Sequence, residues 1–201
     1  QQFYKDILKK LETKTKWVFS GITGRGRLSE DIINLDRSKI RSFYLDNGFV
    51  NVKVSKPRID YIESKDGYLV VFEVEEGDRY KVGTITFTGD LLDDKDLSDY
   101  ITLDESIYFN LSKMEQDIEN LTIVYGDESY AFANIDPIFN QDDDLKQVSI
   151  KYNMEKGEKY KVNKISIFGN TRTRDKVIRR EIKIKEQDPY SGTKIKASKR
   201  F

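Results

Sequence analysis

The residue types available for chemistry are limited, because the chain of 201 residues contains neither histidine nor cysteine. Catalytic triads that need these residues, His or Cys zinc sites and disulfides are therefore excluded. Asp142, Asp143 and Asp144, preceded by Asn140, could bind a divalent cation, but the run lacks the glycine and the distal glutamate of an EF-hand loop. Because it separates two expected strands, a solvated hairpin turn is the favoured interpretation. We expect no metal, no cofactor and no enzyme activity.

A glycine-containing loop offers a second kind of chemistry. Residues 21–24, Gly-Ile-Thr-Gly, match the loop with which KH domains clamp a nucleic-acid backbone, and Arg25 and Arg27 follow it. In KH domains this loop joins two helices, whereas residues 17–20 have an extended pattern, so a connecting loop is favoured. The basic segment 157–201 could also contact nucleic acid, but the acidic segment before it opposes such binding. A KH-like nucleic-acid-binding array stays open as an alternative, while no nucleic acid is the main expectation.

An internal repeat of about 80 residues organises the chain. Residues 75–82, EEGDRYKV, recur as residues 155–162, EKGEKYKV, and residues 43–49 resemble residues 124–130 at an offset of 81. Several matches in the same order exceed what chance would supply. We expect three repeated units: residues 1–76, 77–156 and 157–201.

The middle unit, residues 77–156, is complete enough for its element order to be predicted. Alternating or helically spaced apolar residues indicate a strand, two helices and two strands, in that order. Ser112 and Glu115 form a capping box at the start of the second helix. The expected segments are residues 84–88, 97–101, 112–125, 131–135 and 147–154.

The end units show parts of the same order. The first unit lacks the opening strand, and its second helix should stop at Asn47 and Gly48. Its expected helices and strands are residues 3–11, 40–44, 49–56 and 68–75. The third unit ends inside what should be its second helix. We therefore expect a fragment of a longer protein, in which the longest apolar run is too short for a membrane helix.

The two boundaries between units look alike. The alternation of apolar and polar residues changes phase at Gly83, and it does so in the same way at Asn163. At each of these residues the last strand of one unit meets the first strand of the next. Such short junctions predict an elongated, articulated array. We expect more bending at the first junction, because glycine leaves the backbone freer than asparagine does. The expected junction residues are Gly77, Tyr80, Gly83, Gly157, Tyr160 and Asn163.

These segments resemble a known family. Residues 167–173, IFGNTRT, and 177–181, VIRRE, resemble the opening of the last POTRA domain of BamA-type outer-membrane β-barrel assembly factors. Residues 40–49, IRSFYLDNGF, are similar to the second-helix signature of a preceding POTRA domain, and residues 75–82 to the joint between domains. The registers correspond to the third and fourth POTRA domains and the start of the fifth. The family's own C-terminal membrane barrel, a further implied partner, is absent from this sequence.

The resemblance implies an α+β fold of tandem βααββ domains, each a three-stranded mixed sheet with two helices on one face. It also implies a scaffold in the periplasm of a Gram-negative bacterium that binds unfolded outer-membrane β-barrel proteins. The second strand of each sheet should lie at an edge, where an incoming strand can hydrogen-bond to it. In the first unit this expected edge consists of Phe49, Val50, Asn51, Val52, Lys53 and Val54.

The resemblance further implies that the last unit docks an accessory lipoprotein. The implied docking residues are Asp175, Arg179 and Glu186. We expect Thr173 to cap the helix that carries them, and Val177, Ile178 and Ile182 to be its buried stripe. An alternative is a POTRA module of a two-partner-secretion transporter that recognises one dedicated passenger. Such proteins usually carry two POTRA domains, whereas three units are expected here.

Overall fold

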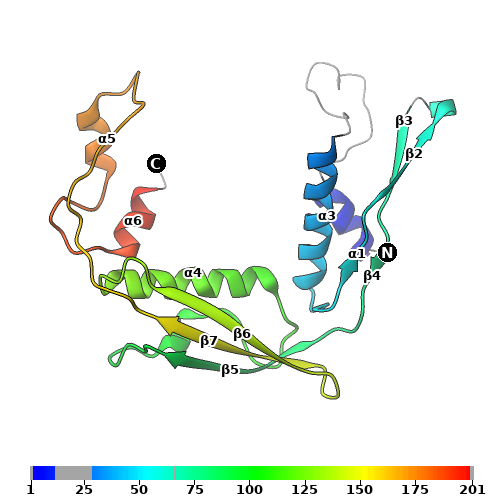
Figure 1. Cartoon of the computed structure of the whole chain (residues 1–201), viewed down its shortest axis with the longest axis horizontal. Coiled ribbons are helices and arrows are strands. Elements are labelled where there is room, and N and C mark those ends of the chain that lie inside the picture. Colours follow the sequence, from blue (N-terminus) through cyan, green and yellow to red (C-terminus); the bar gives the residue numbers. More distant parts are fainter. Residues whose placement is uncertain (1, 12–28, 66, 200–201) are drawn as a thin grey trace. The chain divides into compact units, whose positions relative to one another are not determined.

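The computed structural model of the chain describes residues 2–11, 29–65 and 67–199 (Figure 1). The chain forms two compact units. Unit 1 contains residues 1–81, 107–112 and 144–146, and unit 2 contains residues 82–106, 113–143 and 147–201. The loop at residues 21–24 lies outside the described residues. Within the described ranges, no helix combines the length and the apolar character needed to cross a membrane.

The middle repeat has the predicted order of elements. These are β5 (Lys81–Gly89), the 3₁₀ helix η2 (Leu97–Tyr100), α4 (Leu111–Asp127), β6 (Asn134–Asp142) and β7 (Gln147–Glu155). The strand order is β5-β7-β6, and β6 runs antiparallel to β7. β5 is parallel to β7, because Thr84 contacts Ser149 and Thr88 contacts Asn153 in the same direction. The expected α+β fold with a mixed sheet is therefore confirmed, with α4 over one face (Figure 1).

A buried carboxylate lies in the core of this repeat. The side chains of β7 that point inwards alternate as predicted: Val148, Ile150, Tyr152 and Met154. On α4, Asp117 is fully buried. It accepts hydrogen bonds from the hydroxyls of Tyr152 (3.3 Å) and Thr102 (2.7 Å) and from the Leu103 N–H (3.2 Å). Such donors are what makes a buried carboxylate tolerable, so the network joins α4 to the sheet.

The first repeat is built around one long helix. Its elements are α1 (Gln2–Lys10), α3 (Glu30–Leu45), β1 (Lys53–Val54), β2 (Arg58–Ile62), the 3₁₀ helix η1 (Glu63–Lys65), β3 (Gly67–Val71) and β4 (Val74–Glu75). Ser29 caps α3 by accepting a hydrogen bond from the Ile32 N–H at 3.3 Å. The predicted stop is confirmed, because α3 ends just before Asn47 and Gly48 has a φ of +90°. The core cluster is Ile7, Leu11, Ile40, Phe43, Tyr44, Leu45, Val52 and Val54.

The strand expected at residues 49–56 is shorter than predicted. Only Lys53–Val54 is a strand, because the chain first turns and the Val52 N–H donates to the Phe49 carbonyl at 3.3 Å. The register places Val54 opposite Val74 and Arg58 opposite Val71, so three residues on one strand face two on the other. This extra residue forms a bulge that separates β1 from β2. The bulge also changes the offset between the repeats. Val54 corresponds to the residue 81 positions later, whereas Pro57 corresponds to Pro137, 80 positions later.

The third repeat lacks a strand at residues 164–169, although α5 (Asp175–Glu181) and α6 (Gly192–Ser198) form. In the middle repeat β5 is supported by β7, whereas no described strand lies beside residues 164–169. Two predictions about α5 are wrong. Its N-cap residue is Arg174 rather than Thr173. The stripe of Val177, Ile178 and Ile182 is exposed or half-buried rather than buried, and no described strand packs on it.

The capping box predicted at the start of α4 is also wrong. The helix begins at Leu111, one residue before Ser112. The N–H and the hydroxyl of Ser112 bind Asp46 at 2.8 and 2.9 Å instead of a partner on their own helix. The acidic run at residues 142–144, in contrast, lies at the turn between β6 and β7 as expected.

Candidate interaction sites

The backbone of β1 presents polar groups away from its partner strand. Lys53 pairs with Glu75 and Val54 with Val74, and the Ser55 N–H donates to the Glu73 carbonyl at 3.0 Å. Hydrogen-bonded and non-hydrogen-bonded pairs alternate in an antiparallel ladder, so the N–H and carbonyl of Val54 point outwards. The Val54 carbonyl accepts a hydrogen bond from Nε of Arg37 on α3 at 2.8 Å. The outward edge is thus partly satisfied by a side chain of the neighbouring helix.

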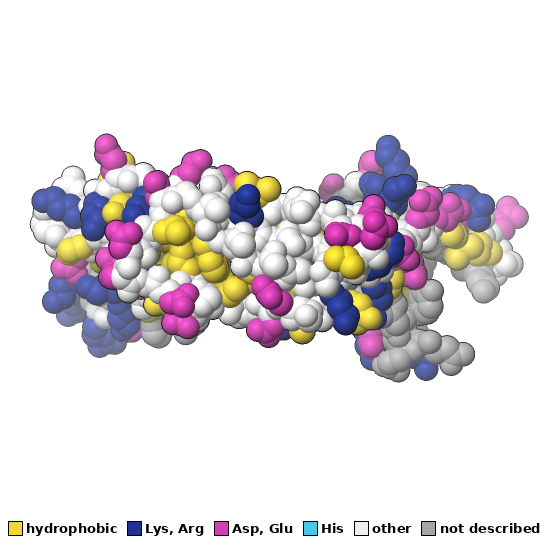
Figure 2. Space-filling view, turned by 90° about the horizontal axis from the view of Figure 1, so that it is seen from below, with side chains coloured by type: hydrophobic (Ala, Val, Ile, Leu, Met, Phe, Trp, Pro, Cys, Tyr) yellow, Lys and Arg dark blue, Asp and Glu magenta, His cyan; other side chains and the backbone are white. Residues whose placement is uncertain are grey.

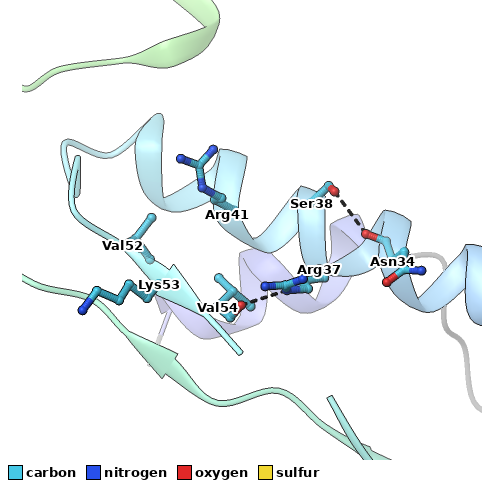
Figure 3. A pocket seen from close by; sticks show the side chains of 7 residues that line it. All are labelled: Asn34, Arg37, Ser38, Arg41, Val52, Lys53 and Val54. Atoms are coloured by element: carbon cyan, nitrogen blue, oxygen red, sulfur yellow. Dashed lines mark hydrogen bonds between the residues drawn. The ribbon is translucent and has the colours of Figure 1, made fainter. Parts of the chain in front are cut away.

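A groove lies between this edge and α3 (Figure 3). It is open to solvent and has a volume of about 520 Å³. Residues 52–54 form one wall, and α3 contributes the other wall through Asn34, Arg37, Ser38 and Arg41. Arg41 lies towards the Val52 end of the groove and Arg37 towards Val54 (Figure 3). Val52 and Val54 turn their side chains into the core, which leaves the backbone to line the groove.

The predicted edge residues divide into two groups. Val52, Lys53 and Val54 line the groove. Phe49, Val50 and Asn51 belong to the turn before β1 and do not extend the edge. The Phe49 ring packs on Tyr44 with centroids 5.4 Å apart, and the Asn51 amide donates to the Tyr80 hydroxyl at 3.5 Å. A strand could therefore be added at Val54 but not along the whole predicted stretch.

A second edge lies at the second strand of the middle repeat, where the sequence reasoning expected an edge but named no residues. β6 pairs only with β7 among the described strands, and it runs unbroken from Asn134 to Asp142. Ile138 and Phe139 on β6 are about half exposed, at 51% and 48%. Hydrophobic side chains gather in a patch over this sheet (Figure 2). The repeated order of elements was the signal for this edge, since it implies one such edge in each complete repeat.

Acidic residues at the ends of α3 and α4 bind the start of the second helix of the following repeat. In unit 1, Asp46 accepts from Ser112, and its carbonyl accepts from the Asn110 amide at 2.8 Å. In unit 2, Asp127 accepts from the Ser191 hydroxyl at 2.7 Å and from the Thr193 N–H at 3.0 Å. Partial burial acts to raise the pKa of Asp127, but the hydrogen bonds from Thr193 and Ser191 outweigh it, so the pKa is lowered. Asp46 and Asp127 are 81 residues apart, so the same contact occurs twice.

The predicted junction residues take part in these contacts in different ways. The Tyr80 N–H donates to the Gly48 carbonyl at 2.8 Å, and the Tyr160 N–H donates to the Ser129 carbonyl at 2.8 Å. Gly77 and Gly157 have left-handed φ values of +70° and +65°. The Asn163 carbonyl accepts from the Gln187 side chain at 3.1 Å.

Gly83 is not the free joint that we expected. It lies inside β5, and a Cβ there would be 2.6 Å from Oγ of Ser149. Its role is close strand packing, because a side chain at this position would collide with the neighbouring strand.

The three residues implied in lipoprotein docking lie together. Arg179 pairs with Asp175 at 2.8 Å and with Glu186 at 3.5 Å, and all three are about half exposed. The hydrogen bond with Asp175, ahead of the charge of Asp175 and Glu186, raises the pKa of Arg179. Arg179 and Glu186 also bind the carbonyl and N–H of Ile165 at 2.9 and 3.0 Å. Glu105 binds the Ile85 N–H in the same way in the middle repeat, so part of this arrangement is structural.

A family model described as "POTRA: Surface antigen variable number repeat" matches residues 4–77, 80–157 and 160–201. The outer membrane protein assembly factor BamA of Nitratidesulfovibrio vulgaris is 36% identical over 199 residues, which cover 96% of this chain and 24% of that protein. BamA of Neisseria meningitidis is 26% identical, covering 98% of this chain and 25% of that protein. The chain thus spans about a quarter of the length of these curated relatives.

Among solved structures, the crystal structure of Haemophilus influenzae BamA POTRA3-5 superposes with a TM-score of 0.73. It is 18% identical and the match covers 97% of this chain and 77% of that chain. BamA from Haemophilus ducreyi lacking POTRA domains 1-3 gives a TM-score of 0.60 at 18% identity, with 81% of this chain and 28% of that chain covered. At this level of identity, the two structures show the fold.

Proposed function

Because the chain belongs to the POTRA family, we propose that it is the scaffold region of an outer-membrane protein assembly factor and binds unfolded β-barrel proteins by strand addition. Its localisation is the periplasm, as the POTRA part of an outer-membrane protein. The KH-like alternative loses its basis, because the family model covers nearly the whole chain. Three matched segments also exceed the two POTRA domains usual in two-partner-secretion transporters.

One observation carries the strand-addition proposal: the outward backbone of Val54 lines an open groove beside α3. A backbone hydrogen bond contributes about 1 kcal/mol net, and β1 offers only a few outward groups. The expected affinity is therefore roughly millimolar. Weak binding of this kind suits a scaffold that accepts many different strands and releases them, because backbone contacts do not depend on the side chains of the substrate.

Alternate N-methylation of a substrate peptide tests this proposal. An outer-membrane-strand peptide is titrated into the 201-residue chain, and amide chemical shifts around Val54 are followed by NMR. In an added strand every second N–H faces the edge, so N-methylation of one alternate set should abolish the shifts while N-methylation of the other set preserves them. Equal effects of both sets, or shifts confined to residues away from both sheet edges, would contradict strand addition.

A proline substitution in the protein does not test this proposal well. Val52→Pro is not a clean test, because the Val52 N–H already serves the turn with Phe49. Removing the outward N–H of Val54 requires a proline at this position, which would also replace a buried core side chain. The modified peptide leaves the protein intact and therefore isolates the backbone contact.

The second part of the proposal is that Asp175, Arg179 and Glu186 dock an accessory lipoprotein. This docking proposal is supported by the cluster that the three side chains form, which is partly exposed and contains both positive and negative charges. Arg179→Glu should abolish co-purification with the lipoprotein, since a charge at the rim of an interface governs recognition. Arg180→Glu is the matched control, because the Arg180 side chain is 76% exposed and, among the described residues, pairs only with its neighbour Glu181. Loss of binding in both variants, or in neither, would remove the site.

A further inference from the structure

The groove between α3 and residues 52–54 carries positive charge that the fold does not use. Arg41 makes no hydrogen bond or ion pair with any described residue. Arg37 uses Nε for the Val54 carbonyl, whereas its Nη groups bind none of the described residues. The third cation, Lys53, is paired with Glu75 at 3.5 Å. Two guanidinium groups therefore face the groove with donors to spare.

The repeat shows that these arginines are not required by the fold. Asp36 of α3 corresponds to Asp117 of α4 at an offset of 81, and both are fully buried. At the same offset, Ile118 and Thr122 take the places of Arg37 and Arg41. The same helix-on-sheet arrangement thus forms without cations beside β6. A pair of arginines at the edge of one repeat alone points to a ligand of that groove.

We propose that this groove binds an extended segment with side-chain carboxylates at alternate positions, of the pattern acidic–any–acidic. Residues four apart on a helix are separated by about 6 Å along the axis, and alternate residues of a strand by about 6.6 Å. Arg41 lies towards Val52 and Arg37 towards Val54, so the two arginines follow the edge in order (Figure 3). Their positions on α3 are four residues apart, which matches the spacing of alternate strand residues. Carboxylates on the helix-facing side of an added strand would meet them in turn.

The contacts of such a segment can be stated group by group. The outward N–H of Val54 donates a hydrogen bond to a carbonyl of the added strand. Arg37 keeps its bond to the Val54 carbonyl through Nε and offers its Nη groups to one carboxylate. Arg41 offers its planar guanidinium to the second, which a carboxylate binds through two parallel hydrogen bonds. Since β1 is only two residues long, these charged contacts supply specificity that the backbone alone cannot.

This inference rests on strand addition at the groove, and a peptide pair tests it separately. Two extended peptides differ only in a Glu-x-Glu or Gln-x-Gln motif, and both are titrated into the full chain at low salt. The Glu peptide should bind about fivefold to tenfold more tightly. Raising the salt to 0.5 M should reduce the difference, because exposed charges are screened. Arg41→Gln should reduce it as well, without affecting the fold, since Arg41 has no structural partner among the described residues.

Lys39→Gln is the matched control, because it removes the same charge from α3 outside the groove. In that variant the preference for the Glu peptide should persist. Equal affinity of the two peptides for the wild-type chain would overturn the inference while leaving strand addition in place. A preference that Lys39→Gln weakens as much as Arg41→Gln would also overturn it, since the cause would be net charge. Absence of binding by both peptides would instead contradict the proposed strand addition.

Discussion

The carboxylate of Asp127 accepts hydrogen bonds from both the N–H and the hydroxyl of Thr193, at 3.0 and 2.6 Å. Asp127 is the last residue of α4, and Thr193 lies in the first turn of α6. One acidic side chain therefore satisfies a free N–H group, that of Thr193, in the first turn of a helix that begins 65 residues after it. Asp46 and Ser112 have the same relationship in unit 1.

Removing either carboxylate should loosen the helix that it caps. Asp127→Ala should destabilise the chain by about 1 kcal/mol, which is the usual effect of losing a helix cap. Hydrogen exchange of the Thr193 amide should accelerate, and Asp46→Ala should have the same effect at Ser112. Glu115→Ala, on the exposed side of α4, is the control. Unchanged exchange at Thr193 in the first variant would mean that the contact does not contribute to order.

The contribution of Asp127 should depend on pH. Its pKa in the folded chain is lowered, so the stabilisation is present above the unfolded pKa, about 4, and is lost as the pH falls through the folded value. Urea denaturation of wild type and Asp127→Asn should therefore differ at pH 7 and converge towards pH 3. The protonated carboxyl then resembles the amide. A difference in stability that stays constant over this range would argue against a charged cap.

Asp117 should be more important for stability than any exposed carboxylate. Asp117→Ala leaves the Tyr152 hydroxyl, the Thr102 hydroxyl and the Leu103 N–H without their buried acceptor. Each unpaired buried group costs about 1–3 kcal/mol, so we expect a loss of about 3 kcal/mol or more. Asp99→Ala, at an exposed position of η2, should change stability by less than about 0.5 kcal/mol. Thermal denaturation of the two variants measures the contrast.

Local patterns were enough to predict the elements whose cores are periodic. The alternation of Val148, Ile150, Tyr152 and Met154 fixed the inward face of β7, and Gly48 marked the end of α3 through its left-handed φ. The buried Asp117 could also have been found, because a carboxylate recurs at Asp36 on the apolar face of the equivalent helix. The alternation along β7 and the end of α3 depend only on residues near one another in the chain.

The remaining features depend on partners that are distant in sequence. Ser112 was interpreted as a helix cap, but its acceptor is Asp46, 66 residues earlier. The break between β1 and β2 follows from one extra residue relative to the middle repeat, which flips the register of the strand. Arg37 reaches the Val54 carbonyl across 17 residues, which no periodicity reports. The alternating pattern predicted the strand and the family resemblance implied that it is an edge, but neither showed how the Val54 carbonyl is satisfied.

The first junction should be held more firmly than the second, which reverses the order expected from Gly83 and Asn163. Arg79 donates to the Asn47 carbonyl at 2.8 Å and lies over the Tyr108 ring at 3.6 Å. Lys159, the counterpart of Arg79, contacts only the Tyr130 ring within the described part of the chain, at 5.1 Å. Planar guanidinium groups stack on aromatic rings and bond carbonyls at once, which an ammonium does less well.

Hydrogen exchange measures this difference without reference to any overall shape. Tyr80 and Phe109 report on the first junction, since the Phe109 N–H donates to the Tyr80 carbonyl at 3.0 Å. Tyr160 and Tyr190 have the same relationship in the second, also at 3.0 Å. Arg79→Ala should accelerate exchange at Tyr80 and Phe109 severalfold, whereas Lys159→Ala should change Tyr160 and Tyr190 little. Arg79→Lys should give an intermediate rate, because the charge remains while the fork of donors is lost. Faster exchange at the first junction than at the second in the wild-type chain would restore the order based on glycine freedom.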